Sequence, residues 1–561
     1  MSAIALDTPV VAARPAETTV MPQHVTAQPV TRKWLGLSAV LAATIMNLLD
    51  STVVNVAAPS IRADLGGSYA SLQWMGAGYT LALAVGLLTG GRLGDMFGRR
   101  RMLLVGVSGF VVASVLCALA GSPEMMIAAR MLQGLFGAVM IPQSFGLIRD
   151  LFPPEQMGKA FGLFGPVIGL STILGPVVAG LLVDGDIAGT GWRMVFAINV
   201  PLGLFALLAG RAALPVSRGN GQRRIDLAGA VLGASGMALA VYPLVQGHEL
   251  GWPLWTFAMM AAAVVVLAVF VRRQLRLAAA GGNPLVELSV FRRRSYTSGV
   301  IFVIVFFGAI AGFSLAVGMF LQIGLGFSPV KASLTMAAWA IGAFLGSGFA
   351  SVMMDRLGRN ILHLGLGLMA VGMLGVYIVF RAVGTEVGGW HLAAPLLTYG
   401  IGMGMIFVPL FGIIMGEVAD HEVGSASGLL ESLQQLGATL GIAVLGTVFF
   451  GVMAAAAPTN FDAVTAPAVR AELTVAGAPA AVQDPMVADL RTCVIEAERA
   501  TDPDVVPAGC RAVDPMLAPA VWSTHQLDAL DAARTLALLT LALTVVGFFL
   551  AFLLPNQPRA H

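Results

Sequence analysis

A carboxylate inside a long apolar run is the first feature of this sequence that indicates chemistry. Asp50 lies in the segment 34–58, which consists mostly of Leu, Val, Ala and Ile. An ionisable group in such a run is costly in a bilayer unless it is paired or hydrated, so it is usually functional. Polar neighbours at helical spacing predict one polar stripe, made up of Asn47, Asp50, Ser51 and Asn55. We expect the stripe to face a wet cavity in which Asp50 accepts a proton.

Arg130 is a second isolated charge in an apolar run and a candidate partner for Asp50. Gln133 and Gly137 follow it at spacings that place all three on one helix face. Two interpretations remain open: Arg130 is the counter-ion of Asp50, or it extends along its helix to the membrane surface. The polar residue beneath it favours the first, and Gln143 further along the run is another candidate cavity residue.

Glu431 is an acid in a late apolar run, and its depth decides its meaning. A helix that begins near Glu422 would place it two to three turns inside, where it is a candidate proton site. A helix that begins later would leave it as a solvated end residue. Gln434, three residues further on, is a candidate cavity residue in either case.

A run of glycine and proline predicts a helix with one nearly bare face. The residues that recur at spacings of three to four are Gly165, Gly169, Thr172, Pro176 and Gly180, with Gly175 directly before Pro176. Small residues at that spacing let a neighbouring backbone approach closely, and proline bends the helix. The run predicts a tight seam on which two parts of the protein seal and slide, with ordinary helix packing as the alternative.

The motifs of common enzymes are absent from the sequence. There is no His-Glu-x-x-His or Gly-x-Ser-x-Gly pattern, and the seven histidines are scattered. The only Gly-Lys pair, Gly158-Lys159, is followed by Ala160 rather than the Ser or Thr of a phosphate-binding loop. We therefore expect no enzyme activity, no metal site, no cofactor and no ATP hydrolysis.

Composition predicts an integral membrane protein. Of 561 residues, 57% are hydrophobic and only 11% are charged, too few to coat a soluble globule. A formal charge of +2 with arginines spread over separate loops gives no indication of nucleic-acid binding. With roughly 20 residues per crossing, the apolar runs predict fourteen spans in an all-α protein whose partner is the lipid bilayer. We expect a monomer.

A basic turn between two apolar runs sets the expected orientation. The segment Gly91 to Arg101 carries Arg92, Arg99, Arg100 and Arg101 beside a single acid, Asp95. Cytoplasmic loops hold the excess of basic residues, so this turn is predicted to be cytoplasmic, as are both termini. A weaker copy with Asp355 and Arg356 follows 260 residues after Asp95. The duplication predicts two homologous halves with a binding site at their interface.

These patterns divide the chain into five parts. Residues 1–31 are predicted to be a flexible cytoplasmic tail and 556–561 a cytoplasmic C-terminus. Between them lie an N-terminal six-span half at 32–213, two linker spans with a basic cytoplasmic loop at 214–296, and a C-terminal six-span half at 297–555. The last half contains a long acidic loop, 454–531, which we expect outside the cell as short helices or as disorder. Cys493 and Cys510 fall in that loop, where the compartment permits a disulfide, and we expect them to pair.

Five stretches together resemble the fourteen-span drug:proton antiporters of the major facilitator superfamily. Gly91 to Arg101, with Gly98 and the two arginines after it, is similar to the superfamily's loop between its second and third spans. The others are similar to its motifs of the first, fourth, fifth and sixth spans: Leu49 to Ala57, Arg130 to Gly137, Gly169 to Gly180 and Trp192 to Pro201. The resemblance covers nearly the whole chain apart from the tail and the long loop.

The resemblance implies the major facilitator fold, two six-helix halves with two additional central helices, and a multidrug exporter of the cell membrane driven by the proton motive force. Proton coupling would involve Asp50, Arg130 and Glu431, and the loops at Asp95 and Asp355 would gate the conformational change. The chain departs from its relatives at Glu431 and Gln434, where they often have Asn and a basic residue, which bears on the charge of the substrate. A dedicated exporter of one endogenous metabolite or lipid is the near alternative, and a membrane-embedded enzyme the remote one.

Overall fold

The computed structural model describes residues 30–153, 156, 171, 175–186, 189–216, 226–247, 250–282, 284–286, 288–415, 417–418, 423–499, 507–511 and 517–555. Regular secondary structure in these ranges is entirely helical, which confirms the predicted fold class. Twelve of the described helices are long and apolar enough to cross a membrane. The predicted number of fourteen spans stays a prediction.

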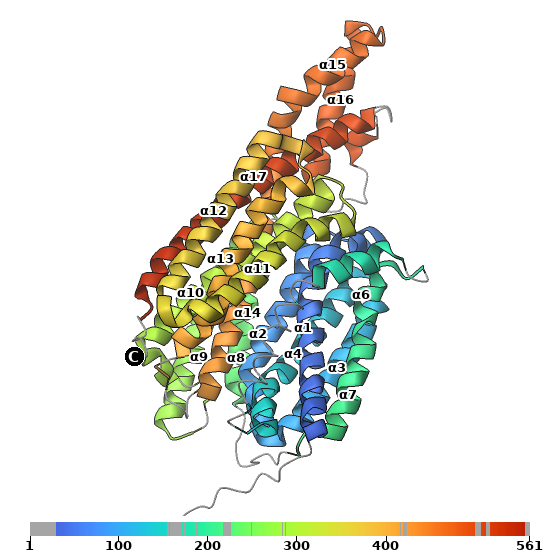
Figure 1. Cartoon of the computed structure of the whole chain (residues 1–561). Coiled ribbons are helices and arrows are strands. Elements are labelled where there is room, and N and C mark those ends of the chain that lie inside the picture. Colours follow the sequence, from blue (N-terminus) through green and yellow to red (C-terminus); the bar gives the residue numbers. More distant parts are fainter. Residues whose placement is uncertain are drawn as a thin grey trace, which may run out of the picture.

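The N-terminal half, α1 to α7, lies beside the C-terminal half, α10 to α14 with α17 (Figure 1). The first comprises α1 (Val30–Leu65), α2 (Tyr69–Phe97), α3 (Arg99–Ala118), α4 (Pro123–Leu151), the short helix Gly175–Asp184, η2 (Gly191–Arg193), α6 (Met194–Ala197) and α7 (Asn199–Ala213). A linker pair follows, α8 (Leu227–Gln246) and α9 (Leu254–Ala279). The second half comprises η3 (Leu288–Arg292), α10 (Arg294–Met319), the π-turn η4 (Phe320–Gly324), α11 (Pro329–Leu357), α12 (Asn360–Val383), η5 (Gly384–Glu386), α13 (Gly389–Met415), α14 (Val423–Asn460), the π-turn η6 (Phe461–Thr465), α15 (Ala466–Val475), α16 (Ala480–Arg499), η7 (Ala508–Cys510), α17 (Ala518–Leu550) and η9 (Ala551–Leu553).

The two halves repeat the same packing. In the first, α4 packs on α2 and α3, and in the second α13 packs on α11 and α12. Glycine ends the second helix of each half with a positive φ, 91° at Gly98 and 50° at Gly358, a conformation that side chains with a Cβ rarely adopt. These two turns belong to the duplicated basic segments, so the repeat that the sequence predicts is also a repeat of structure.

The turn at Gly98 marks one end of the bundle, which we call the arginine-rich end. The opposite end, which we call the extension end, carries α15 and α16, and these project beyond the bundle (Figure 1). The halves meet through α2 and α14. Ser432 Oγ donates to the carbonyl oxygen of Ala84 at 2.6 Å, and Thr439 Oγ1 donates to Thr80 Oγ1 at 2.7 Å. Thr80 lies on the part of α2 that leads to the extension end, and Ala84 lies at the middle of the helix.

The linker helix α8 is bonded to both halves near the extension end. Trp74 of α2 donates its indole N–H to Gln246 Oε1 at 3.1 Å, and Thr447 of α14 donates its hydroxyl to the carbonyl oxygen of Leu244 at 2.8 Å. Its neighbour α9 packs on α8 and leaves most of its outer surface exposed. The linker pair is therefore part of the bundle and lies against the seam between the two halves.

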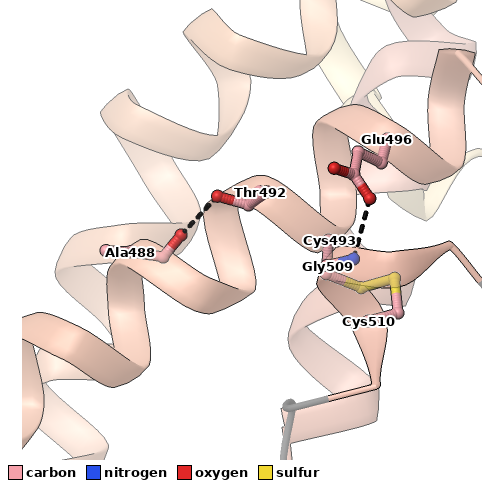
Figure 2. The surroundings of a disulfide bond; sticks show 6 residues. All are labelled: Ala488, Thr492, Cys493, Glu496, Gly509 and Cys510. Carbon is pink, nitrogen blue, oxygen red and sulfur yellow. Dashed lines mark hydrogen bonds between the residues drawn. A yellow bond between two sulfur atoms is a disulfide. The ribbon is translucent and has the colours of Figure 1, made fainter.

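The long acidic loop is largely helical where the structure describes it. Helix α14 continues to Asn460, past the predicted span end at 453, and α15 and α16 then pack through their own buried apolar side chains. A disulfide joins Cys493 of α16 to Cys510 (Figure 2). Beside it, the backbone N–H of Gly509 donates to Glu496 Oε2 at 2.8 Å. Of the two alternatives for this loop, short helices are the one that its described part adopts.

Candidate transport site

Asp50 and Arg130 form a buried ion pair in the N-terminal half. Asp50 comes from the middle of α1 and Arg130 from the first turns of α4, and each residue is only 1% exposed. Arg130 Nη1 donates to Asp50 Oδ2, and Arg130 Nε donates to the carbonyl oxygen of Met75 at 3.2 Å. The guanidinium is thus directed into the half, and Arg130 does not extend to the membrane surface.

Neutral side chains complete the coordination of the carboxylate. Gln133 Nε2 and Asn199 Nδ2 donate to Asp50 Oδ1 at 2.7 and 2.9 Å, while Gln133 Oε1 accepts from Arg130 at 2.7 Å. Ser114 on α3 accepts from both amides, at 2.8 Å from Gln133 and 3.2 Å from Asn199. Helices α1, α3, α4 and α7 therefore contribute to one polar cluster. Removal of any single member would leave an unpaired buried polar group in this cluster.

An aromatic ring covers the guanidinium. The Cζ atom of Arg130 lies 4.2 Å from the ring centroid of Tyr79 on α2, a cation–π contact. The hydroxyl of Tyr79 donates to Asn47 Oδ1 at 2.7 Å, one turn before Asp50 on α1. The charge cluster is closed on this side by α2.

The predicted polar stripe of α1 does not behave as one wet surface. Asn47 and Asp50 are buried against other helices of their own half because their polar atoms are bonded there. Ser51 is partly exposed and donates to the carbonyl oxygen of Leu48, and the side chain of Asn55 lies outside the described residues. The expectation that the whole stripe faces a cavity is wrong for Asn47 and Asp50, since paired polar groups inside the half replace water.

Glu431 lies on α14, eight residues after the helix begins at Val423, which is about two turns along it. It is half-buried, as is Gln434. The next residue, Ser432, bonds to α2 of the other half. Glu431 is thus next to the contact between the halves and separate from the Asp50 cluster.

The described arginines of the first predicted gating loop bond to different parts of the chain. Arg92 Nη2 donates to the carbonyl oxygen of Pro284, in the linker, at 3.0 Å, whereas Arg99 and Arg100 are anchored within the N-terminal half. Arg99 Nη1 lies 3.2 Å from Asp150 Oδ1 at the end of α4, and Arg100 donates to the carbonyl oxygen of Arg211 at 2.6 Å. Gly91 lies beside Pro142, and Gln143 donates to the carbonyl oxygen of Gly90 at 2.9 Å. An inter-half latch that includes Arg99 is therefore not formed in this conformation, because Asp150 is the partner of Arg99.

The second loop copy is anchored within its own half. Arg356 is exposed, and Arg359 donates to the carbonyl oxygens of Phe552 and Leu554 at 3.1 and 2.6 Å, at the turn η9 that follows α17. The side chains of Asp95 and Asp355 lie outside the described residues.

The glycine and proline run is described only in its second part, since Gly165, Gly169 and Thr172 lie outside the described residues. A Cβ at Gly175 would lie 2.3 Å from Thr52 Oγ1 on α1, and one at Gly180 would lie 2.9 Å from the carbonyl oxygen of Pro329 on α11. Asp184 Oδ2 accepts from the backbone N–H of Val330 at 3.1 Å. Pro176 is half-buried between these contacts. The run thus seals against the other half near the extension end.

Sequence reasoning missed three members of the site: Ser114, Tyr79 and Asn199. Asn199 lies in the stretch Trp192 to Pro201, which resembles a motif of the sixth span. However, an uncharged amide at the start of an apolar run is typical of a helix end. The signal that was available is the absence of other amides in the run 194–213.

A two-half helical bundle with paired charges buried between its helices is the architecture of a secondary transporter. The chain belongs to the Major Facilitator Superfamily, whose family model matches residues 40–442. It is a multi-pass membrane transporter and not an enzyme.

Several relatives are similar to most of the chain. It is 46% identical to the "probable actinorhodin transporter" of Streptomyces coelicolor, over 95% of this chain and 93% of that protein. It is 36% identical to the "tetracenomycin C resistance and export protein" of Streptomyces glaucescens, over 74% and 76% of the two chains. Among solved structures, a bacterial homologue of the lysosomal transporter Spinster matches with a TM-score of 0.59 at 15% identity, over 94% of this chain and 97% of that one. That likeness concerns the fold alone.

Proposed function

We propose that the protein exports amphipathic organic compounds, such as drugs or antibiotics, from the cytoplasm or the inner leaflet in exchange for protons. The observation that carries this proposal is the buried Asp50–Arg130 pair, a carboxylate held by one cation and two neutral amides. A proton on Asp50 removes the charge that Arg130 compensates, so binding and release of one proton change the forces between α1 and α4.

The proposed orientation places the arginine-rich end and both termini in the cytoplasm. Basic loops remain on the cytoplasmic side, and the disulfide of the extension fits an oxidising compartment outside. With this orientation, the inter-half contacts Thr439–Thr80 and Asp184–Val330 lie toward the external side, and Ser432–Ala84 lies at the middle of α2. We infer from these contacts an inward-facing state, the one that loads an exporter.

The exchange of substrate for proton follows because the two are bound and released in different conformational states. In the inward-facing state the substrate enters and a proton leaves Asp50. The loss of this proton restores the ion pair of Asp50 with Arg130. In the outward-facing state a proton from outside neutralises Asp50, and the substrate leaves. A potential of 100 mV supplies about 2.3 kcal/mol for each charge that crosses, so no nucleotide is required.

The names of the relatives support antibiotics as the substrate class. Two of them are named as an actinorhodin transporter and a tetracenomycin C export protein, and a third, 35% identical over 80% of this chain, as a puromycin resistance protein of Streptomyces alboniger. A dedicated exporter of one metabolite is the second candidate, because the relative named for a single compound matches 95% of the chain. Transport of a panel of dyes, lipids and antibiotics separates a broad from a narrow exporter.

The test of coupling uses purified protein in sealed proteoliposomes without nucleotide. An imposed pH difference, acidic on the extension side, should drive uptake of a fluorescent amphipathic dye toward that side, and a protonophore should collapse it. Uptake that requires ATP, or that ignores the pH difference, would refute proton exchange.

A further inference from the structure

The charge cluster of the N-terminal half has a structural counterpart in the C-terminal half. A Cβ at Gly134 on α4 would lie 2.4 Å from the carbonyl oxygen of Tyr79, and one at Gly400 on α13 would lie 2.0 Å from the carbonyl oxygen of Trp339. Tyr79 and Trp339 each lie ten residues after the first residue of their helix, α2 or α11. Two close backbone contacts at the same depth therefore put Tyr79 and Trp339 at equivalent positions.

This register pairs Gln133 with Tyr399, since each directly precedes the glycine of its contact. In the first half Gln133 is bonded to both members of the ion pair. In the second half the equivalent position is aromatic. The ring of Tyr399 lies 5.6 Å from that of Trp339 and 5.5 Å from that of Phe313 on α10, measured between centroids. The C-terminal half therefore has an aromatic ring, packed against two others, at the position where the N-terminal half has the amide that bonds both charges.

Two hydrogen-bond donors of this aromatic cluster have no partner among the described residues. They are the indole N–H of Trp339 and the hydroxyl of Tyr399. The residues are 8% and 0% exposed, so bulk water does not satisfy them. At position 399, phenylalanine would fill nearly the same space without the penalty of an unpaired buried donor, and packing alone does not require the indole N–H at position 339. Buried Trp and Tyr usually have a partner for the polar atom.

We propose that Phe313, Trp339 and Tyr399 form the subsite that receives the transported compound, and that this compound carries a flat aromatic ring system with carbonyl or phenolic oxygens. The rings offer stacking faces, and the two donors match acceptor oxygens at the edge of such a system. The inference rests on the proposed function, because a transported molecule is the acceptor that arrives and departs.

The surroundings of the cluster suit an occupant that enters and leaves. Met336 lies one turn before Trp339 on α11, and Met403 lies one turn after Tyr399 on α13; both are buried. Methionine side chains are flexible and repack around ligands of different outline. In this arrangement the N-terminal half binds the proton and the C-terminal half recognises the transported compound.

The test measures binding to the purified full-length protein in detergent, with two flat fluorescent probes. One is 1,8-dihydroxyanthraquinone, which has carbonyl and phenolic oxygens, and the other is ethidium, which has neither. Tyr399→Phe and Trp339→Phe remove one donor each and keep a ring. Each should weaken dihydroxyanthraquinone binding about tenfold, the loss of one hydrogen bond. Ethidium binding should change less than about twofold. Trp390→Phe, on α13 and 92% exposed, is the control and should change neither.

Thermal unfolding of the same variants separates recognition from packing. Tyr399→Phe should keep or raise the melting temperature, because it deletes an unpaired buried hydroxyl. Unchanged dihydroxyanthraquinone affinity in both variants, equal weakening of the two probes, or no binding of the quinone by the wild type would each overturn the subsite. Detergent binding needs no gradient, so intact binding selectivity without proton-driven uptake would refute the exporter and leave the subsite standing.

Discussion

The carboxylate of Asp50 and the guanidinium of Arg130 compensate each other inside the N-terminal half, with their side chains 0% and 1% exposed. Removing one partner of a buried pair typically costs about 3–5 kcal/mol, because the other charge is left without compensation. Protonation is the one reversible way to remove the charge of Asp50. The pair is therefore stable when intact and sensitive to a single proton.

Asp50→Asn should abolish proton-driven export while the protein still inserts and binds substrate. The amide has nearly the shape of the protonated acid and is fixed in the neutral form, so the pair with Arg130 cannot re-form. Uptake under an imposed pH difference is the measurement. Asp64→Asn, at the partly exposed end of the same helix, should retain uptake. If Asp50→Asn vesicles still concentrate the dye, the proton site lies elsewhere and Glu431 is the next candidate.

Glu431→Gln should weaken transport of cationic compounds more than that of neutral ones. The side chain is half-buried beside the contact of α14 with α2, where its charge attracts a cation and has little effect on a neutral molecule. Competition between a cationic and a neutral compound for dye uptake gives the ratio of apparent affinities, which we expect to fall severalfold. Glu386→Gln, in the turn after α12, serves as a charge-matched control. Equal loss for both compounds would contradict a role in charge selection.

Asp95→Asn should lower the turnover rate more than the substrate affinity. The loop before Gly98 lies at the arginine-rich end, so a change there shifts the populations of the two states without touching the ligand. Initial rates and half-saturation constants of dye uptake separate the two effects. A normal rate with weakened binding would place Asp95 in the binding site instead.

Loss of the Cys493–Cys510 disulfide should destabilise the extension by about 3 kcal/mol in the chain-entropy model, since it closes a loop with a sequence separation of 17. The double variant Cys493→Ser/Cys510→Ser should be cut by added protease sooner in that region. Cys117→Ser, a buried single cysteine in α3, is the control. Thiol-reactive reagents should fail to label Cys493 and Cys510 in intact cells without reductant, and labelling of both would refute the bridge.

Asp226 should make the linker pair sensitive to acid. Partial burial opposes its charge, but hydrogen bonds from Arg273, from the Gly229 N–H and from Gln274 outweigh this and hold the pKa of Asp226 below 3.8. A depressed folded-state pKa contributes stability above the unfolded pKa, and that stability is lost as pH falls through the folded pKa. Wild-type protein should therefore unfold at a higher temperature than Asp226→Asn near pH 7, and the difference should shrink as the pH falls below the ordinary pKa of aspartate and through the lowered folded-state pKa. A difference that is independent of pH would show that the charge of Asp226 is not the cause.

The sequence was sufficient for features that depend on isolated charges and repeats. Asp50 and Arg130 stand alone in apolar runs, so each is the obvious partner for the other, and the two glycine turns repeat at a fixed offset. The partner of Arg99 was not predictable, because Asp150 follows 51 residues later at the end of another helix. Trp339 and Tyr399 resemble ordinary core residues in a sequence, and only coordinates show that their donors are unpaired. Alanine and proline in the extension gave no periodicity from which α15 and α16 could be drawn.

The two bonds of α8, to Trp74 in one half and to Thr447 in the other, bear on the geometry of opening. The halves cannot rotate apart along this seam without breaking one of the bonds or taking the linker pair along. Along the opposite seam, where the helix Gly175–Asp184 meets α11, no third element of the described chain bridges the halves in this way. We therefore expect the two halves to separate by rotation about an axis at α8, with the larger opening on the opposite side. A compound that leaves sideways into the lipid should do so on that side, away from the linker.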